Sequence, residues 1–327
     1  MKHISILIPR GHTSLVNIAG AHQIFNMVNE IRADMNKSAV FDVHLVGLEE
    51  NVPQSTGLFS ASPDCLMEDV RTTDLIIIPA IHDNPRKGYE QNKEFVPWIV
   101  DQYTAGAEVA SFCVGAFFLA ETGLLNGKQC ATHWMHAESF KTMYPTIHLV
   151  DEKIMTEEDG IYTSGGAYAF TDLLLHIIEK YAGREEAIMA SKAFSLDISR
   201  ESQSDFIIFK GQKDHDDDKV REAQQFIESH YQEKISVGNL ASHLAMSRRT
   251  LERRFKKATR NTVTEYKQRV KVEAAKRDLE TSRKNVTEVM YDVGYSDTKS
   301  FRNLFNRITG LTPLDYRNKY NKETAIV

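Results

Sequence analysis

The sequence predicts a doubly wound α/β domain with a mostly parallel, flavodoxin-like sheet, followed by an all-α domain with two helix-turn-helix units. Three observations support this fold class. Short runs of Val, Ile and Leu alternate with helical stretches in the first two thirds of the chain. One helical pattern occurs twice in the last third, and the net charge changes sign between the two parts.

Composition excludes several classes of protein. The chain has 327 residues, 42% of them hydrophobic and 26% charged, which is typical of a globular protein with about two domains. No apolar run approaches the roughly 18 residues that span a bilayer, so we expect a cytoplasmic protein without membrane contact. Cys65, Cys113 and Cys130 are odd in number and lack CxxC spacing, which argues against disulfides and a zinc site. We expect no metal or other cofactor.

The apolar runs predict the strands of a parallel sheet. They lie at residues 3–9, 41–48, 74–80 and 108–113. The intervening stretches predict helices at about 16–33, 92–105, 115–123 and 167–181. Ligands of such sheets bind at the carboxyl ends of the strands, where Arg10, His82 and Cys113 would lie.

Cys113 is the strongest candidate for reactivity in this half. The segment Ser111–Gly115 lies where a buried strand turns sharply into a helix, as at a nucleophile elbow. The helix N-terminus would favour the thiolate. A buried cysteine acting as a small hydrophobic residue fits the same spacing, and the sequence leaves both interpretations open.

The basic C-terminal part is typical of a nucleic-acid partner. Residues 1–211 carry 16 Lys and Arg against 28 Asp and Glu, a net charge of −12, whereas residues 212–327 carry 24 against 17, or +7. A solvated basic surface is the alternative. With the acidic stretch near residue 215 as a boundary, we predict an acidic N-terminal domain at 1–205, an acidic linker at 206–218 and a DNA-binding domain at 219–322; the sensor and dimerisation role of the first domain is implied by the resemblance described below.

The repeated pattern predicts two helix-turn-helix units. In the first, helix 237–244 is followed by a turn and a second helix from Arg248; in the second, helix 286–293 is followed by a turn and a helix from Thr298. Ser247 is the predicted N-cap of the first recognition helix, and either Ser296 or Asp297 caps the other. A helix over 263–281, without Gly or Pro, would fix the spacing of the units. The chain could then address two successive major grooves about 34 Å apart.

The sides of the two predicted recognition helices that face away from the core carry groups suited to binding DNA. Guanidinium groups bind phosphate or guanine, and amide and hydroxyl groups read base edges. The alternative is a helical bundle whose basic face is only solvated. The predicted DNA-binding residues are Arg248, Arg249, Glu252, Arg253, Lys256, Thr298, Lys299, Ser300, Arg302 and Asn303.

These segments resemble the AraC/XylS family of transcription regulators. VGNLASHLAMSRRTLERRFKK resembles the family's first helix-turn-helix, and VTEVMYDVGYSDTKSFRNLFNRITGLTPLDYR resembles its second. The resemblance implies a double-stranded DNA operator, a homodimer on two half-sites, and RNA polymerase as a candidate partner. It also implies base contacts, which we place by position at Arg249, Glu252, Arg253, Lys299, Ser300 and Asn303.

The N-terminal part resembles the class I amidotransferase-like, or ThiJ/PfpI, domain that is fused to AraC-type regulators. ASFCVGAFFLAETGLLNGKQCATHW and YTSGGAYAFTDLLLHIIEKYAG carry the resemblance. Active relatives have His, Ser or Thr after the cysteine and acids in an early motif, where this chain has Val114, Asn17 and Gln23. We therefore expect no catalysis, and expect a small-molecule effector in a pocket at the strand ends. The predicted pocket residues are Cys113, Val114, Asn17, Gln23, His82, Trp134, Ser164 and Gly165.

The sequence therefore predicts a ligand-responsive transcription regulator. A cysteine-dependent hydrolase or glyoxalase-like enzyme with a DNA-binding tail is the alternative from the enzyme class. A third interpretation is a domain that only dimerises. The sequence does not identify the effector or the operator.

Overall fold

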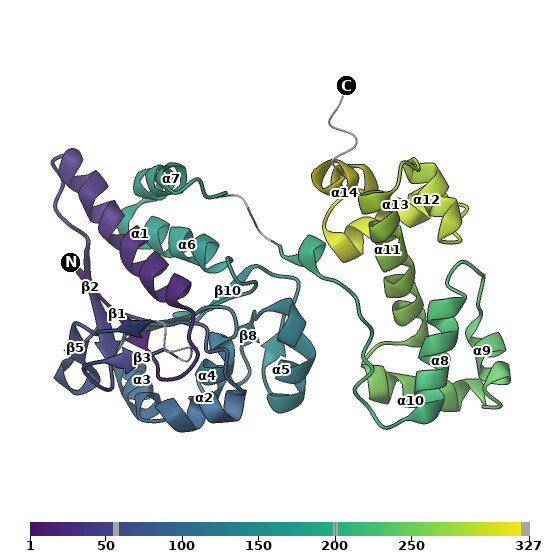
Figure 1. Ribbon diagram of the computed structural model, residues 1–327, viewed down its shortest axis with the longest axis horizontal. Coiled ribbons are helices and arrows are strands. Elements are labelled where there is room, and N and C mark those ends of the chain that lie inside the picture. Colours follow the sequence, from purple (N-terminus) through teal and green to yellow (C-terminus); the bar gives the residue numbers. More distant parts are fainter. Residues whose placement is uncertain (55–58, 199, 201, 322–327) are drawn as a thin grey trace. The chain divides into compact units, whose positions relative to one another are not determined.

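The computed structural model describes residues 1–54, 59–198, 200 and 202–321 of the chain (Figure 1). The chain folds into two compact units, a first unit, Met1–Gln203, and a second unit, Ser204–Val327. The segment predicted as a linker, 206–218, falls in the second unit. Residue 322, the predicted end of the DNA-binding domain, lies outside the described residues. None of the described helices combines the length and apolar character needed to cross a bilayer.

The first unit is built on a seven-stranded sheet in the order β10-β11-β7-β6-β1-β2-β5. All neighbouring strands are parallel except the edge pair β10 and β11. Two short pairs, β3 with β4 and β8 with β9, lie outside this sheet. The strands are β1 (Lys2–Ile8), β2 (Phe41–Gly47), β3 (Val52–Pro53), β4 (Ser60–Ala61), β5 (Cys65–Leu66), β6 (Leu75–Ile78), β7 (Glu108–Ser111), β8 (Gln129–Cys130), β9 (His148–Leu149), β10 (Met155–Glu158) and β11 (Ile161–Ser164).

Helices cover both faces of this sheet, as Figure 1 shows. On one face α1, α6 and α7 pack on alternate residues of β1, such as Ile4 and Ile6; on the other, α3 and α4 pack on Leu7 and Ile76. Because both faces are buried, the central strands are apolar throughout. The helices are α1 (Leu15–Asp34), α2 (Pro85–Asn92), α3 (Phe95–Thr104), α4 (Gly115–Glu121), α5 (Ala137–Met143), α6 (Phe170–Ala182) and α7 (Arg184–Ala193).

The predicted fold class of the first unit is confirmed. Each predicted strand ends within two residues of an observed one. The single helix expected at 92–105 is wrong at its start, because α2 ends at Asn92 and α3 begins at Phe95. Sequence reasoning missed α2 itself, which Asn84 caps before Pro85.

The second unit is all-helical and has two hydrophobic cores. The first lies under α8, α9 and α10 and includes Leu251 and Phe255; the second lies under α12, α13 and α14 and includes Phe301 and Phe305. The long helix α11 contributes to both cores, so it connects the two helix-turn-helix units as predicted. The helices are α8 (Asp218–Ser229), α9 (Val237–His243), α10 (Arg248–Thr259), α11 (Val263–Thr281), α12 (Val286–Asp292), α13 (Thr298–Thr309) and α14 (Pro313–Tyr320).

Candidate nucleic-acid interface and Cys113 site

The first helix-turn-helix consists of α9 and α10. Ala245, in the turn between them, has a left-handed backbone with φ of 53°. Ser247 is the N-cap of α10 and accepts a hydrogen bond from Thr250 N–H, as predicted. Leu251 and Phe255 anchor α10 in the core, which turns its charged residues to the surface.

The exposed face of α10 is strongly basic. Arg249, Arg253 and Lys256 are exposed. Arg248 is exposed too, but its Nε donates to Oε1 of Glu252 at 2.9 Å along the helix. The described hydrogen bonds include no such partner on α10 for Arg249 or Arg253, so no partner on the helix restrains these two guanidinium groups at the surface.

Arg254, one residue further on, has a structural role. Its guanidinium donates two hydrogen bonds to the carboxylate of Asp217, from Nε at 2.8 Å and from Nη2 at 2.6 Å. Asp217 is also the N-cap of α8. The Arg254 hydrogen bonds are the main cause that lowers the pKa of Asp217, so this ion pair ties α10 to α8.

The second helix-turn-helix repeats this arrangement with one extra residue in the turn. Gly294 takes the place of Ala245, with φ of 74°. Asp297, rather than Ser296, is the N-cap of α13 and accepts from Ser300 N–H at 2.8 Å. The structure thus decides between two caps that the sequence leaves open.

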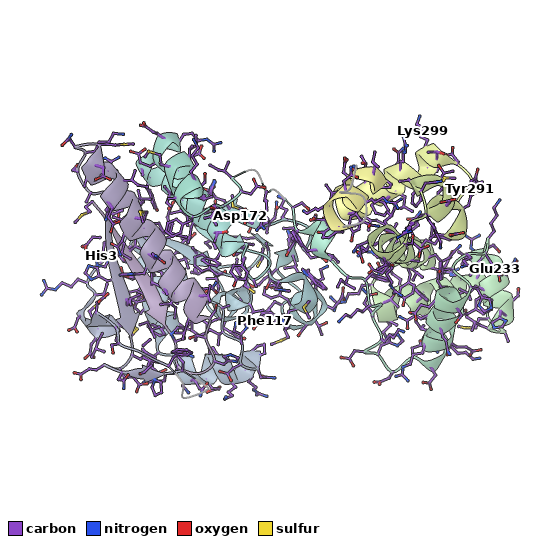
Figure 2. All side chains as sticks on the ribbon, turned by 45° about the horizontal axis from the view of Figure 1, so that its top comes forward. His3, Phe117, Asp172, Glu233, Tyr291 and Lys299 are labelled. Atoms are coloured by element: carbon purple, nitrogen blue, oxygen red, sulfur yellow. The ribbon has the colours of Figure 1, made fainter. Side chains whose placement is uncertain are left out.

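The exposed face of α13 is rich in hydroxyl and amide groups. Figure 2 shows Lys299 at the surface of the second unit. Phe301, Leu304 and Phe305 are buried between these polar positions. The exposed predicted residues are Thr298, Lys299, Ser300, Arg302 and Asn303.

Lysines of α11 contact both helix-turn-helix units. Lys271 is buried and donates to the carbonyl of Val293 at 2.6 Å, and Lys267 donates to the carbonyl of Ile235, just before α9. Burial, with the nearby charge of Lys267, lowers the pKa of Lys271 to about 8. A Cβ at Gly294 would overlap the carbonyl oxygen of Gln232, so the α8–α9 loop packs directly on the second turn. These contacts fix the two helix-turn-helix units relative to each other.

In the first unit, Cys113 lies in the turn between β7 and α4. Its φ of 55° is left-handed, which is uncommon for a non-glycine residue. Gly115 follows closely, and a Cβ there would lie 2.6 Å from the carbonyl oxygen of Pro79. The sharp strand-to-helix turn that the sequence suggested is therefore present.

The backbone of Cys113 is hydrogen-bonded on both sides, and its thiol is buried. Its N–H donates to the carbonyl of Ser164 at 3.1 Å, and its carbonyl accepts from Thr132 Oγ1 at 2.9 Å. Burial raises the pKa of the thiol to about 11, although a hydrogen bond from the Val114 backbone opposes this shift. The pKa of the thiol is thus raised, whereas the helix N-terminus was expected to lower it.

Histidines form a cluster in this unit. The rings of His12 and His82 lie 5.1 Å apart and those of His133 and His136 6.0 Å apart. Partial burial lowers the pKa of His82, His133 and His136, and neighbouring histidines add to the shift of the first two. Among the described hydrogen bonds, none joins an imidazole to the Cys113 thiol.

The other predicted pocket residues are only partly brought together. Ser164 contacts Cys113 directly. Asn17 is buried, and its Oδ1 accepts a hydrogen bond from Ala80 N–H at 3.1 Å, which connects α1 to the end of the sheet. Gln23 is exposed on α1, and none of the described hydrogen bonds joins it to Cys113. Val114 and Gly165 are buried, and Trp134 is half-buried.

Sequence reasoning missed Gln203. Its buried Nε2 lies 3.1 Å from the carbonyl oxygen of Thr132, 2.9 Å from that of Asp151 and 3.1 Å from that of Lys153. Its amide fills the space beside Gly165, and its Oε1 is buried without a hydrogen-bond partner among the described residues. Position 203 follows a polar stretch, and nothing in that pattern signals burial.

Comparisons with known proteins agree with this architecture. Residues 240–319 match the model of a helix-turn-helix domain family, and residues 22–180 match that of the DJ-1/PfpI family. The helix-turn-helix transcriptional regulator GbdR of Pseudomonas aeruginosa is 23% identical over 305 residues, covering 93% of this chain and 81% of GbdR. An isonitrile hydratase of Pseudomonas putida is 31% identical over 148 residues, 44% of this chain and 61% of the hydratase.

A solved structure shows the same fold in the first unit. An AraC family transcriptional regulator from Pseudomonas putida aligns with a TM-score of 0.51 and 17% identity, over 59% of this chain and 100% of that chain. The protein thus joins a DJ-1/PfpI domain to a helix-turn-helix domain, and the latter implies DNA binding. The chain thus has the domain composition of an AraC-type helix-turn-helix transcriptional regulator with an N-terminal DJ-1/PfpI domain.

Proposed function

We propose that the chain reads one operator through two successive major grooves, with α10 in one groove and α13 in the next. The observation that carries this proposal is the pair of exposed recognition faces on one connecting helix. Arg249 and Arg253 on α10 would contact guanines or phosphates, and Ser300 and Asn303 on α13 would read base edges. A homodimer would place two such pairs on related half-sites, with RNA polymerase as a candidate partner in the cytoplasm.

We also propose that the DJ-1/PfpI domain senses a small metabolite without turning it over. Support comes from the state of Cys113, whose thiol is protonated at neutral pH and is joined to no imidazole among the described hydrogen bonds. A nucleophilic thiol needs a base or a lowered pKa. Binding would control DNA affinity only if the effector favours one state of the protein over another.

The test uses the full chain and follows tryptophan fluorescence during heating with a panel of amines, amino acids, betaines and aldehydes. Trp98 and Trp134 both lie in the first unit, so the signal reports the proposed sensor. A ligand at about one hundred times its Kd would stabilise that unit by about 2.7 kcal/mol. A bound compound that is recovered unchanged and alters operator affinity supports the sensor.

The second candidate is an enzyme with Cys113 as the nucleophile, and the similarity to an isonitrile hydratase favours enzymatic activity of this domain. A compound that is consumed, with consumption lost in Cys113→Ser, would establish it and overturn the sensor proposal. If no compound of any class shifts the transition, a domain that only dimerises is supported instead.

A further inference from the structure

Three potential metal ligands lie together on one face of the sheet, away from Cys113. In the parallel pair β1–β2, His3 lies opposite Asp42 and Ser5 lies opposite His44. Because side chains alternate along a strand, His3, Asp42 and His44 project from the same face. Figure 2 places His3 on the N-terminal strand of the first unit.

The three side chains are close in space. His44 Nε2 lies 3.0 Å from Asp42 Oδ1, and the His3 and His44 rings stack with their centroids 4.7 Å apart and 15° between their planes. One ligand atom from each residue lies within 4.8 Å of the others, and all three residues are half-buried. The described residues contain no other such group of three.

Hydrogen bonds around His3 leave one of its ring nitrogens available. Thr73 Oγ1 donates its single proton to backbone carbonyls, those of His3 at 3.1 Å and Leu75 at 3.2 Å, and it accepts from Ser5 Oγ. His3 Nδ1 lies 3.1 Å from the same oxygen, and in the tautomer in which Nδ1 is the donor, the Nε2 lone pair is left to bind an ion. In most metal sites, a histidine binds the ion through one ring nitrogen while its other ring nitrogen donates a hydrogen bond that fixes the orientation of the ring.

Two carboxylates lie near His3, those of Asp42 and Asp74. Asp74 is already engaged, since it accepts from Lys2 Nζ and from His3 N–H, both at 2.8 Å. Asp42 is thus the carboxylate left to bind an ion.

We propose that His3, Asp42 and His44 form a binding site for a divalent transition-metal ion such as Zn²⁺. Two imidazoles and one carboxylate match the ligand preference of this class, with water completing the shell. Metal–ligand bonds of about 2.0–2.2 Å hold ligand atoms about 3–3.5 Å apart, so the Asp42–His44 pair already has the required spacing. The remaining ligand atoms, up to 4.8 Å apart, need to close by about 1.3–1.8 Å. One imidazole also needs to turn out of the stack, because the in-plane lone pairs of nearly parallel rings do not converge on one ion. The ion would replace the direct Asp42–His44 hydrogen bond.

The test titrates Co²⁺, and then Zn²⁺ in competition, into full-length, tag-free protein that has been freed of metal with a chelator. The proposal predicts one Co²⁺ per chain with visible absorption, displaced by Zn²⁺. His44→Ala and Asp42→Asn should each weaken Co²⁺ binding about tenfold or more, and Thr73→Val should weaken it less, because it removes only the hydrogen bond that orients His3.

His133→Ala is the matched control, since it removes a histidine of the cluster near Cys113 and should leave Co²⁺ binding unchanged. Circular dichroism establishes that each variant is folded. Absence of saturable binding would overturn the proposal. So would binding that survives His44→Ala and Asp42→Asn but is lost in His133→Ala, because it would assign the metal to the other histidines.

Discussion

Gly294→Ala should destabilise the second unit, whereas the matched change Ala245→Gly should not. The two residues occupy the same place in the two helix-turn-helix turns, and both have left-handed backbones, with φ of 74° and 53°. The first turn already accommodates a methyl group. The second cannot, because a Cβ would overlap the Gln232 carbonyl oxygen and lie 2.8 Å from Lys271 Nζ.

The size of the effect follows from three contributions. A left-handed alanine costs about 1–2 kcal/mol. Displacing the Gln232 backbone resembles overpacking, at about 1–3 kcal/mol. The lower entropy of the unfolded alanine chain returns about 0.4–1 kcal/mol. We therefore expect a loss of about 1–4.5 kcal/mol for Gly294→Ala, with a middle value near about 3 kcal/mol. For Ala245→Gly we expect a change within about 1 kcal/mol, because strain relief and unfolded-state entropy oppose each other.

Urea denaturation of the full chain measures this with two probes. Far-ultraviolet circular dichroism reports the helices of both units, while the two tryptophans, Trp98 and Trp134, report only the first. At an m-value of about 2 kcal/mol per M, Gly294→Ala should move the circular dichroism transition of the second unit down by about 1.5 M and leave the tryptophan transition in place. A circular dichroism transition like that of the wild type would refute the steric reasoning.

Three further predictions follow from the structure. Arg254→Ala should lower the stability of the second unit, because it removes the ion pair with Asp217 at the start of α8, whereas Arg253→Ala should leave stability unchanged. Thermal unfolding followed by circular dichroism compares the two variants. Equal effects on stability would contradict the roles assigned to the two arginines. At pH 8, iodoacetamide should alkylate Cys113 more slowly in the folded chain than in the denatured chain, because the pKa of the folded thiol is about 11. The rate in the folded chain should rise as the pH approaches 11. Rapid labelling at pH 8, detected by mass spectrometry, would instead show an exposed thiolate. Lys271 has a pKa of about 8, so it binds its proton less tightly in the folded than in the unfolded chain. The stability of the second unit should therefore rise between about pH 8 and about pH 9.5. Denaturation curves of Lys271→Met should show a smaller rise over the same pH range.

Much of the fold could be predicted because its signals are local. Apolar runs marked β1, β2, β6 and β7, and helical periodicity marked both helix-turn-helix units and the helix α11. The strands β3, β4, β5, β8, β9, β10 and β11 and the helices α2, α5 and α7 were not predicted. These strands have only two to four residues, too few for a clear periodicity, and Asn84-Pro85 fits a turn and a helix start equally well.

The site was less predictable, because burial and hydrogen-bond partners depend on residues distant in sequence. Arg253 and Arg254 are adjacent and chemically identical, yet one is exposed and the other binds Asp217 of another helix. Cys113 was correctly placed at a strand-to-helix turn, but the degree of burial that raises the pKa of its thiol is a property of the packed unit. The same holds for Gln203, since its partners lie on segments 50 to 71 residues away.

Selection of operator sequences from random duplex DNA tests the central claim most directly. The full chain is compared with Arg253→Ala on α10 and Asn303→Ala on α13. The account predicts that each variant loses base preference at its own position, by about 1–3 kcal/mol, and that the two positions lie about one DNA turn apart. If both variants weaken binding to all sequences equally, or relax the same base pairs, the two helices do not read successive grooves.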